Sequence, residues 1–206
     1  GIDGLWIKDK NSVFYQGKKL EKISSNNFNY FNGGISYDKI LVDKNGAYKL
    51  LENENQKDKI IPLDSKNIDL KTLERIDSPM DSSNYFKDKN GVYIYSYDDT
   101  VKKFIGLDPE TVDALNKSYL KDKNGIYYLD KIIKGADKNS FEIMGWGYAK
   151  DRNNVYYEDK KVSGADINTF EVKEDIVKDK NSIYSNGKKL EGADIQTFRK
   201  LNEDYD

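Results

Sequence analysis

The residues that most often carry acid–base and nucleophilic chemistry are missing from this chain. It has 206 residues, and none of them is histidine or cysteine. Thiol nucleophiles, histidine bases, Ser–His–Asp triads, disulfides and zinc sites with Cys or His ligands are therefore excluded. The groups that remain for chemistry are 36 carboxylates and 16 tyrosines. Their patterns, taken in turn, favour no catalytic residue, no cofactor and no metal site.

The carboxylates could bind calcium or act as acid and base in hydrolysis, but a turn and a solvated loop explain their patterns better. Asp122-Lys-Asn-Gly is spaced like the opening of a calcium loop, but Ile126 stands where the next oxygen ligand is needed. Turn formation explains this pattern better, because Asp and Asn bond their own backbone in turns. The pair Asp98-Asp99 supplies two carboxylates of the kind that glycosidases use. In a chain so rich in acids, a solvated loop is the simpler interpretation of this pair.

Tyrosine rings could instead stack on sugars or bases, because they combine an aromatic face with a hydroxyl. Three tyrosines stand next to an aromatic position that recurs along the chain: Tyr15, Tyr128 and Tyr157. We take these three as the candidate ligand-binding residues. The alternative, equally weighted, is that they complete the core and leave their hydroxyls at its rim.

An internal repeat organises the whole chain. Its marker is Asp-Lys/Arg-Asn, which begins at Asp9, Asp43, Asp88, Asp122, Asp151 and Asp179. Two and three residues before each of these corner aspartates, and four residues after it, the side chain is apolar or aromatic. Five residues after it the side chain is aromatic in every copy, at Phe14, Tyr48, Tyr93, Tyr127, Tyr156 and Tyr184. Such agreement does not arise from composition, so the six blocks are copies of one repeat. We number the copies one to six by their corner aspartates.

Each marker predicts a hairpin between two β-rich runs. The Asp opens the turn by bonding its own backbone, and Asn-Gly then supplies the positive φ of a type I turn with a G1 bulge. Ser12 and Ser182 stand in place of the glycine, so we expect a different turn type in copies one and six. A second tight turn follows, clearest at Gln16-Gly17 and Asn186-Gly187, and leads into a third short strand.

The end of each copy changes to a helix-like pattern. Asp108-Pro109-Glu110-Thr111 has an N-cap, a proline at the first helical position and an acid in the first turn. We predict one to two helical turns here and at the equivalent place in the other copies. To align with the other copies, copies two and three need insertions, around Glu52–Lys57 and Tyr97–Val101. The predicted capping residues are Ser24, Asp64, Asp108, Asp137, Asp166 and Asp194.

These elements define the fold class: mainly β with short helical turns, built of three-stranded β-meanders. Both faces of the strands carry apolar residues, so a single copy cannot bury them, whereas stacked copies can. We therefore predict one repeat domain, residues 1–206, stacked as an elongated array, with a closed propeller-like ring as the alternative. The predicted units are residues 6–33, 40–76, 85–116, 119–144, 148–173 and 176–201.

The repeated block resembles the bacterial DKNYY family. Its best copies are Asp122–Phe141, Asp151–Phe170 and Asp179–Phe198, in which the marker is followed by an aromatic pair or single tyrosine and later by Ala-Asp. The resemblance covers nearly the whole chain, and copy two departs from it most. It implies no activity, because the family has no assigned biochemical function, and it transfers no functional residues to this chain.

Charge and hydropathy limit the partners. Lys and Arg number 34 against 36 acids, and both signs are mixed along the chain, so we expect no nucleic-acid partner. No apolar run approaches the ~20 residues of a membrane span. We expect a monomer that belongs to the bacterial cell envelope or is secreted, with a cytoplasmic location as the alternative.

Three hypotheses for function follow. Extended repeats offer long surfaces and no catalytic set is present, so the first is a non-catalytic binding or adhesion module with a protein or glycan partner. The second is a structural spacer, and the third is a carboxylate-based hydrolase. Exposed tyrosines on one face would favour binding, uniformly polar faces the spacer, and a pocket with two buried carboxylates the hydrolase.

Overall fold

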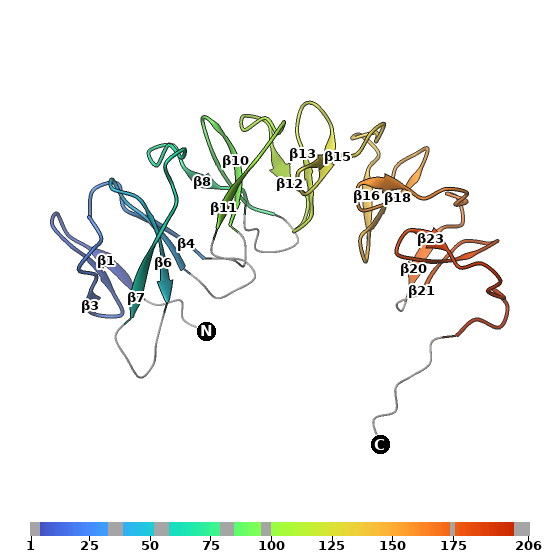
Figure 1. The fold of residues 1–206 in the computed structure, drawn as a ribbon, viewed down its shortest axis with the longest axis horizontal. Helices are drawn as coiled ribbons and strands as arrows, with labels where there is room; N and C mark the ends of the chain where they lie inside the picture. The colour runs from blue at the N-terminus through green and yellow to red at the C-terminus, as the bar shows by residue number, and fades with distance from the viewer. Residues whose placement is uncertain are drawn as a thin grey trace, which may run out of the picture. The chain divides into compact units, whose positions relative to one another are not determined.

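The computed structural model describes residues 5–32, 39–51, 58–78, 85–95, 100–173 and 176–199, apart from the side chain of Asn32. Its regular elements are short β-strands (Figure 1), and these ranges contain no helix. Glu52–Lys57 and the pair Asp98-Asp99 lie outside the described residues, as does most of Tyr97–Val101.

The chain forms two compact units, and the first comprises residues 1–117. It holds the hairpins of copies one to three, in which neighbouring strands are antiparallel. The first sheet has the order β1 (Trp6–Lys8), β2 (Val13–Tyr15) and β3 (Lys18–Lys19). The second has β4 (Asn29–Asn32), β5 (Lys39–Val42), β6 (Ala47–Leu51) and β7 (Lys59–Leu63). The third has β8 (Glu74–Arg75), β9 (Tyr85–Asp88), β10 (Gly91–Tyr95) and β11 (Val101–Phe104), and β12 (Asp113–Ala114) follows along the chain.

The second unit comprises residues 118–206 and holds the hairpins of copies four to six. Copy four has β13 (Tyr119–Lys121), β14 (Ile126–Tyr128) and β15 (Lys131–Ile132). Copy five has β16 (Glu142–Gly145), β17 (Tyr148–Lys150), β18 (Val155–Tyr157) and β19 (Lys160–Lys161). Copy six has β20 (Glu171–Lys173), β21 (Ile176–Lys178), β22 (Ile183–Ser185) and β23 (Lys188–Lys189).

The register repeats from copy to copy. Tyr119 pairs with Tyr128 in copy four, and Tyr148 pairs with Tyr157 at the same place in copy five. The six small antiparallel sheets of three or four strands therefore follow one another in tandem, as the sequence predicts. The described residues form no closed barrel or ring, so the propeller-like alternative is not found.

The ends of copies two to five differ from the predicted helix. In copy five, Thr169 donates its backbone N–H to the carbonyl of Asp166 over 3.2 Å, and the turn stops there. The chain then enters β20, which pairs with β21 of the next copy. One hydrogen-bonded turn therefore replaces the predicted one to two helical turns, and a fourth strand follows that the three-stranded prediction lacks. We call this element the cap turn.

The Asp-Lys-Asn-Gly corners also differ from the prediction. Gly46, Gly91 and Gly125 do not adopt positive φ, so the predicted G1 bulge is wrong. Ser12 and Ser182 therefore fit the same turn, with the same bond from the Asp N–H to their carbonyl. Positive φ occurs instead at the second turn in copies one and six: Gln16, Gly17, Asn186 and Gly187 lie between 48° and 76°, as a type I′ turn requires.

Neighbouring copies share their core. One cluster combines Val162 and Phe170 from the third strand and cap turn of copy five with Val177 and Tyr184 from the hairpin of copy six. A lone copy would leave these side chains in water, at a cost of about 1.5–3 kcal/mol for each large one. The predicted stacking of copies is therefore confirmed within the described residues.

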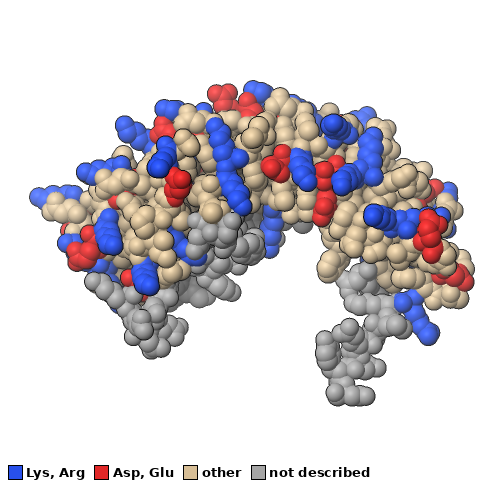
Figure 2. All heavy atoms as spheres, in the orientation of Figure 1, with Lys and Arg blue, Asp and Glu red and all other residues tan. Residues whose placement is uncertain are grey.

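The surface is polar and of mixed charge. Figure 2 shows Lys and Arg side chains interspersed with Asp and Glu over the visible face, in keeping with a net charge of −2. Among the described residues, no helix is long and apolar enough to cross a membrane.

Candidate functional site

The corner aspartates form the most regular polar structure in the molecule. In copy five, Oδ1 of Asp151 accepts the backbone N–H groups of Asn153 at 2.7 Å and Asn154 at 2.8 Å. This local bonding is the turn chemistry that the sequence predicts for Asp. It also occurs at the other five corners, including the exposed Asp9, whose Oδ1 accepts two N–H groups at 2.7 Å.

The second carboxylate oxygen of an inner corner reaches the preceding copy. Oδ2 of Asp151 accepts the backbone N–H of Asp137, the first residue of the cap turn of copy four, at 2.8 Å. Oδ2 of Asp179 accepts the N–H of Asp166 in the same way at 2.7 Å. Both corner carboxylates are buried. A buried aspartate thus fastens one copy to the copy before it, and we call this set of contacts the joint.

The joint is completed by the recurrent tyrosine and by an ion pair. The hydroxyl of Tyr184 donates to Oδ2 of Asp179 at 2.7 Å. Lys180, the next residue after the corner, places Nζ 2.7 Å from Oδ2 of Asp166 and donates its backbone N–H to the Thr169 hydroxyl. A buried carboxylate is stable only when such donors replace water, and here all its partners come from two adjacent copies.

These contacts set the protonation state of both groups. Burial opposes ionisation of Asp179, but the N–H groups of Asp166 and its own turn, together with Tyr184, outweigh burial and lower the pKa of its carboxyl. Asp151 has a lowered pKa for the same reasons. Burial, then the hydrogen bond to Asp179, raises the pKa of Tyr184 to about 12. The pair is therefore a carboxylate accepting from a neutral phenol, which is a structural pair with no proton to exchange near neutral pH.

The joint corrects the sequence alignment of copy two. Sequence spacing assigns its cap to Asp64, but the N–H that reaches the next corner, Asp88, belongs to Asp69. Lys89 pairs with Asp69 at 2.6 Å and bonds Thr72, as Lys180 does with Asp166 and Thr169. The signal that could have found this is Asp-x-x-Ser/Thr in the cap, which Asp69 has and Asp64 lacks.

A second set of tyrosines, three residues before the corners, also bridges copies. The hydroxyl of Tyr119 donates to the carbonyl of Gly147 at 2.7 Å. The hydroxyl of Tyr148 accepts the N–H of Gly187 at 2.8 Å. Most of the recurrent tyrosines are therefore used within the stack rather than presented to a ligand.

The three candidate tyrosines lie in separate places. Tyr15 is buried against Trp6, with ring centroids 4.4 Å apart. Tyr128 and Tyr157 are half-buried, and their hydroxyls point to the following copy, at 3.5 Å from Glu158 and 3.2 Å from Asn186. These contacts fit the alternative in which the tyrosines complete the core. Their role as ligand-binding residues stays a prediction.

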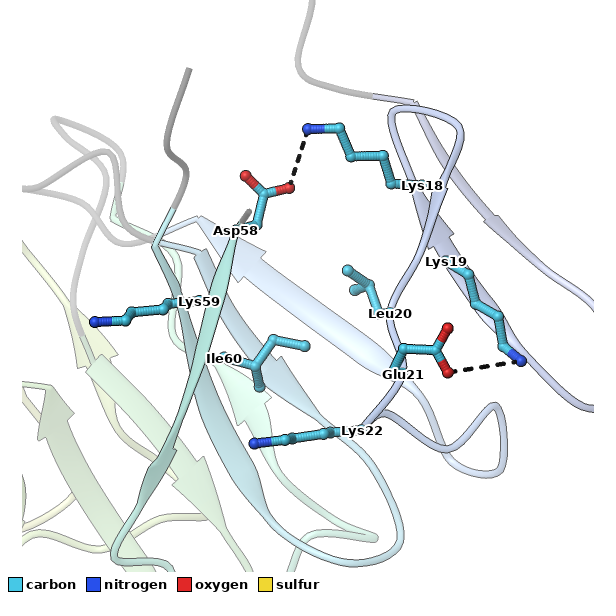
Figure 3. Close-up of a pocket in the computed structure, with 8 residues that line it drawn as sticks. All are labelled: Lys18, Lys19, Leu20, Glu21, Lys22, Asp58, Lys59 and Ile60. Carbon is cyan, nitrogen blue, oxygen red and sulfur yellow. Dashed lines mark ion pairs between the residues drawn. The ribbon is translucent and has the colours of Figure 1, made fainter. Parts of the chain in front are cut away.

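A groove of about 320 Å³ lies within the first unit and is the candidate binding site (Figure 3). It runs between β3 of copy one and β7 of copy two, each of which is the edge strand of its sheet. Leu20 and Ile60 face each other across it, and Lys22 extends along one end. Lys18 pairs with Asp58 at 3.6 Å at the other end. The lining residues are Lys18, Lys19, Leu20, Glu21, Lys22, Asp58, Lys59 and Ile60.

The groove combines an apolar floor with excess positive charge. Four of its eight lining residues are lysines, and two are acids. An edge strand also has backbone N–H and C=O groups on one side that no strand of its own sheet pairs with. Such a site favours an extended, acidic ligand. The sequence signal for it is the pair Lys18-Lys19 on a predicted third strand, which sequence reasoning passed over.

Among the described residues, no group of three acidic side chains converges as metal ligands. The buried corner carboxylates accept hydrogen bonds within the joints. The pair Asp98-Asp99 is not among the described residues.

The fold and the joints define a class: a tandem β-meander repeat protein in which, within each compact unit, a buried corner aspartate fastens one copy to the copy before it. Residues 93–206 match the model of the DKNYY family. This match covers more than half of the chain, so the protein belongs to the DKNYY family. Comparisons with the curated proteins and with the solved structures found no match.

Proposed function

We propose that this protein is a non-catalytic binding module of the bacterial envelope or the secreted space. Its groove between β3 and β7 binds an extended, acidic segment of a partner protein. One observation carries the proposal: two edge strands border the same lysine-lined groove, over the apolar floor of Leu20 and Ile60. Main-chain bonding to a free edge supplies affinity for an extended peptide, and flanking charge selects its sign.

Lysines on edge strands have a second explanation, which is protection against edge-to-edge aggregation. β19 provides the comparison, because its Lys160 and Lys161 are exposed on the edge strand of copy five. These two lysines do not line the groove between β3 and β7. If the lysines only protect edge strands, reversing their charge at the groove and at β19 should affect peptide binding equally. If the groove binds the peptide, only the change at the groove between β3 and β7 should weaken binding.

The test is titration of a fluorescent peptide that alternates Glu with Val into the full chain at low salt. We expect saturable binding, which the double substitution Lys18→Glu and Lys22→Glu weakens at least about tenfold. The control, Lys160→Glu with Lys161→Glu, changes the charge equally and leaves binding intact. No binding by the wild type, or equal loss in both variants, would overturn the proposal. Binding of an acidic glycan but not of the peptide would assign the groove to a glycan partner.

A structural spacer is the second candidate. The observation in its favour is that the recurrent tyrosines and corner aspartates are used in contacts between copies. A spacer needs joints and no ligand, so failure of every titration with an intact fold would favour it.

A further inference from the structure

The two tryptophans of the chain have opposite surroundings. Trp6 packs against Tyr15 and Tyr30, with ring centroids 4.4 Å and 4.5 Å apart. Trp146 is 69% exposed, and among the described residues its indole stacks on no ring and its Nε1–H has no hydrogen-bond acceptor. A single exposed apolar side chain is ordinary on a protein surface. The backbone of Trp146, however, is not ordinary.

Trp146 and Gly147 form the two-residue turn between β16 and β17, with φ values of 52° and 79°. These are the left-handed values of a type I′ turn, whose first position favours Asn, Asp or Gly. At the second turn of copy six, Asn186 and Gly187 adopt the same conformation. A bulky side chain at positive φ is strained, so Trp146 weakens its own turn. Because neither burial nor turn geometry favours tryptophan here, the residue points to a function in binding.

The turn that carries Trp146 is fixed by two copies. The carbonyl of Gly147 accepts the backbone N–H of Glu158 from copy five and the hydroxyl of Tyr119 from copy four, each at 2.7 Å. The ring of Tyr157 lies so close that a Cβ added at Gly147 would be 3.2 Å from it. A ligand that stacks on the indole therefore has to order only the side chain of Trp146, which favours affinity.

Polar groups border this turn. The side chain of Glu158 lies next to Gly147, and its Cγ would be 3.7 Å from a Cβ added there. The hydroxyl of Tyr128 donates to Oε1 of Glu158 at 3.5 Å. An aromatic face combined with a carboxylate acceptor suits a sugar, whose C–H groups lie on the ring while its hydroxyls donate to the carboxylate. The same carboxylate repels an anionic partner.

We propose that Trp146 is the stacking platform of a binding site for a neutral carbohydrate. One sugar ring lies on the indole, and the carboxylate of Glu158 accepts hydrogen bonds from the sugar hydroxyls. Tyr128, one of the candidate residues from the sequence, borders this site and positions that carboxylate. The site lies in the second unit and shares no residue with the groove between β3 and β7. It therefore does not depend on the function proposed for that groove.

The test is titration of the full chain with two uncharged oligosaccharides, cellohexaose and chitohexaose, followed by tryptophan fluorescence. We expect at least one to bind saturably. Trp146→Asn weakens this binding about tenfold or more because stacking is lost, yet it raises the urea midpoint of unfolding because Asn suits the turn. The control, Ile105→Asn, changes a residue of the first unit that is 87% exposed and leaves binding intact. No binding of either sugar, equal loss in both variants, or a lower urea midpoint for Trp146→Asn would overturn the proposal.

Three further measurements separate the sugar from other partners. Glu158→Gln keeps the size of the side chain but removes its charge, and we expect it to lower sugar affinity about fivefold. Unchanged affinity would contradict the assigned carboxylate. Vesicles of phosphatidylcholine should leave the tryptophan emission unchanged, and a Trp146-dependent blue shift on vesicles without sugar binding would assign the ring to a membrane surface and overturn the proposal. Lys18→Glu with Lys22→Glu should retain sugar binding, so the groove and this site can fail separately.

Discussion

Asp151 and Asp9 make the same local turn but have different surroundings. Asp151 is buried and accepts bonds from Asp137, from two N–H groups of its own turn and from Tyr156. Asp9 is exposed and accepts only from its own turn among the described residues. The marker therefore has two roles: it shapes the hairpin at both aspartates, and at Asp151 it also fastens that hairpin to the cap turn of the preceding copy.

The largest expected effect on stability comes from removing a buried corner carboxylate, compared with removing an exposed one. Asp151→Ala leaves the N–H of Asp137, two turn N–H groups and the Tyr156 hydroxyl without their acceptor, and we expect a loss of about 3 kcal/mol or more in unfolding free energy. Asp9→Ala removes only the exposed turn bonds and costs about 1 kcal/mol. Urea denaturation of both variants measures the difference. Equal losses would show that the joint adds nothing to the turn.

The second turns of copies one and six offer a matched pair of glycines. Gly17 and Gly187 have φ of +76° and +75°, but an added Cβ at Gly17 meets nothing within 4 Å, whereas at Gly187 it lies 2.7 Å from Cβ of Tyr157 in copy five. Gly17→Ala carries only the left-handed strain, about 1–2 kcal/mol. Gly187→Ala adds a clash worth about 1–3 kcal/mol more. Thermal and urea unfolding of the two variants should differ by this increment; identical values would mean that copies five and six do not pack at this turn.

Loss of a single hydroxyl is expected to have a smaller effect. Tyr156→Phe removes the 2.7 Å bond to Oδ2 of Asp151 and should cost about 1–1.5 kcal/mol. Tyr157→Phe, one residue away, removes an exposed bond to Asn186 and should cost no more than about 0.5 kcal/mol. Denaturant unfolding of the two variants provides the measurement. A larger loss for Tyr157→Phe would place the important contact elsewhere.

The smallest effect is a dependence on pH. The folded pKa of Asp151 and Asp179 is lowered, so the unfolded state binds more protons in the acid range and stability falls as pH falls. The stability that these groups contribute is complete above the ordinary aspartate pKa of about 4 and is lost below it. Asp151→Asn should flatten part of this acid slope in unfolding free energy measured from pH 7 to 3. An unchanged slope would show that Asp151 does not contribute to it.

The repeat and the sheets could be predicted from the sequence because they depend on local patterns. Adjacent apolar and aromatic residues on both sides of each corner predict the strands, and Asp-x-Asn predicts the turn. The fourth strand could not be found this way, because β20 pairs with a hairpin of the next copy and has little pattern of its own. Gly125 is misleading for a related reason: glycine at a corner suggests positive φ, but Ser12 and Ser182 in the same place show that φ is ordinary there.

The site was harder to predict than the fold. The second partner of Asp179 comes from the neighbouring copy. Which copy packs there is decided by the tertiary structure, and local sequence patterns do not show it. Spacing predicts Asp64 as the cap of copy two, whereas the bond to Asp88 comes from Asp69, which lies five residues later. Lys18 and Lys160 stand on equivalent strands, so the position of Lys18 within its copy does not by itself predict the groove that it lines.

The joints have a consequence for how such chains change through gene duplication. The joints of copies five and six connect groups at most 21 positions apart in the sequence, as Gly135 and Tyr156 are. These joints use no residue from the rest of the chain. A stretch of DNA encoding one whole copy can therefore be inserted or deleted between two corners while the flanking partners find each other again. The joints therefore set no limit on the number of copies, whereas deletion of half a copy removes one side of a joint.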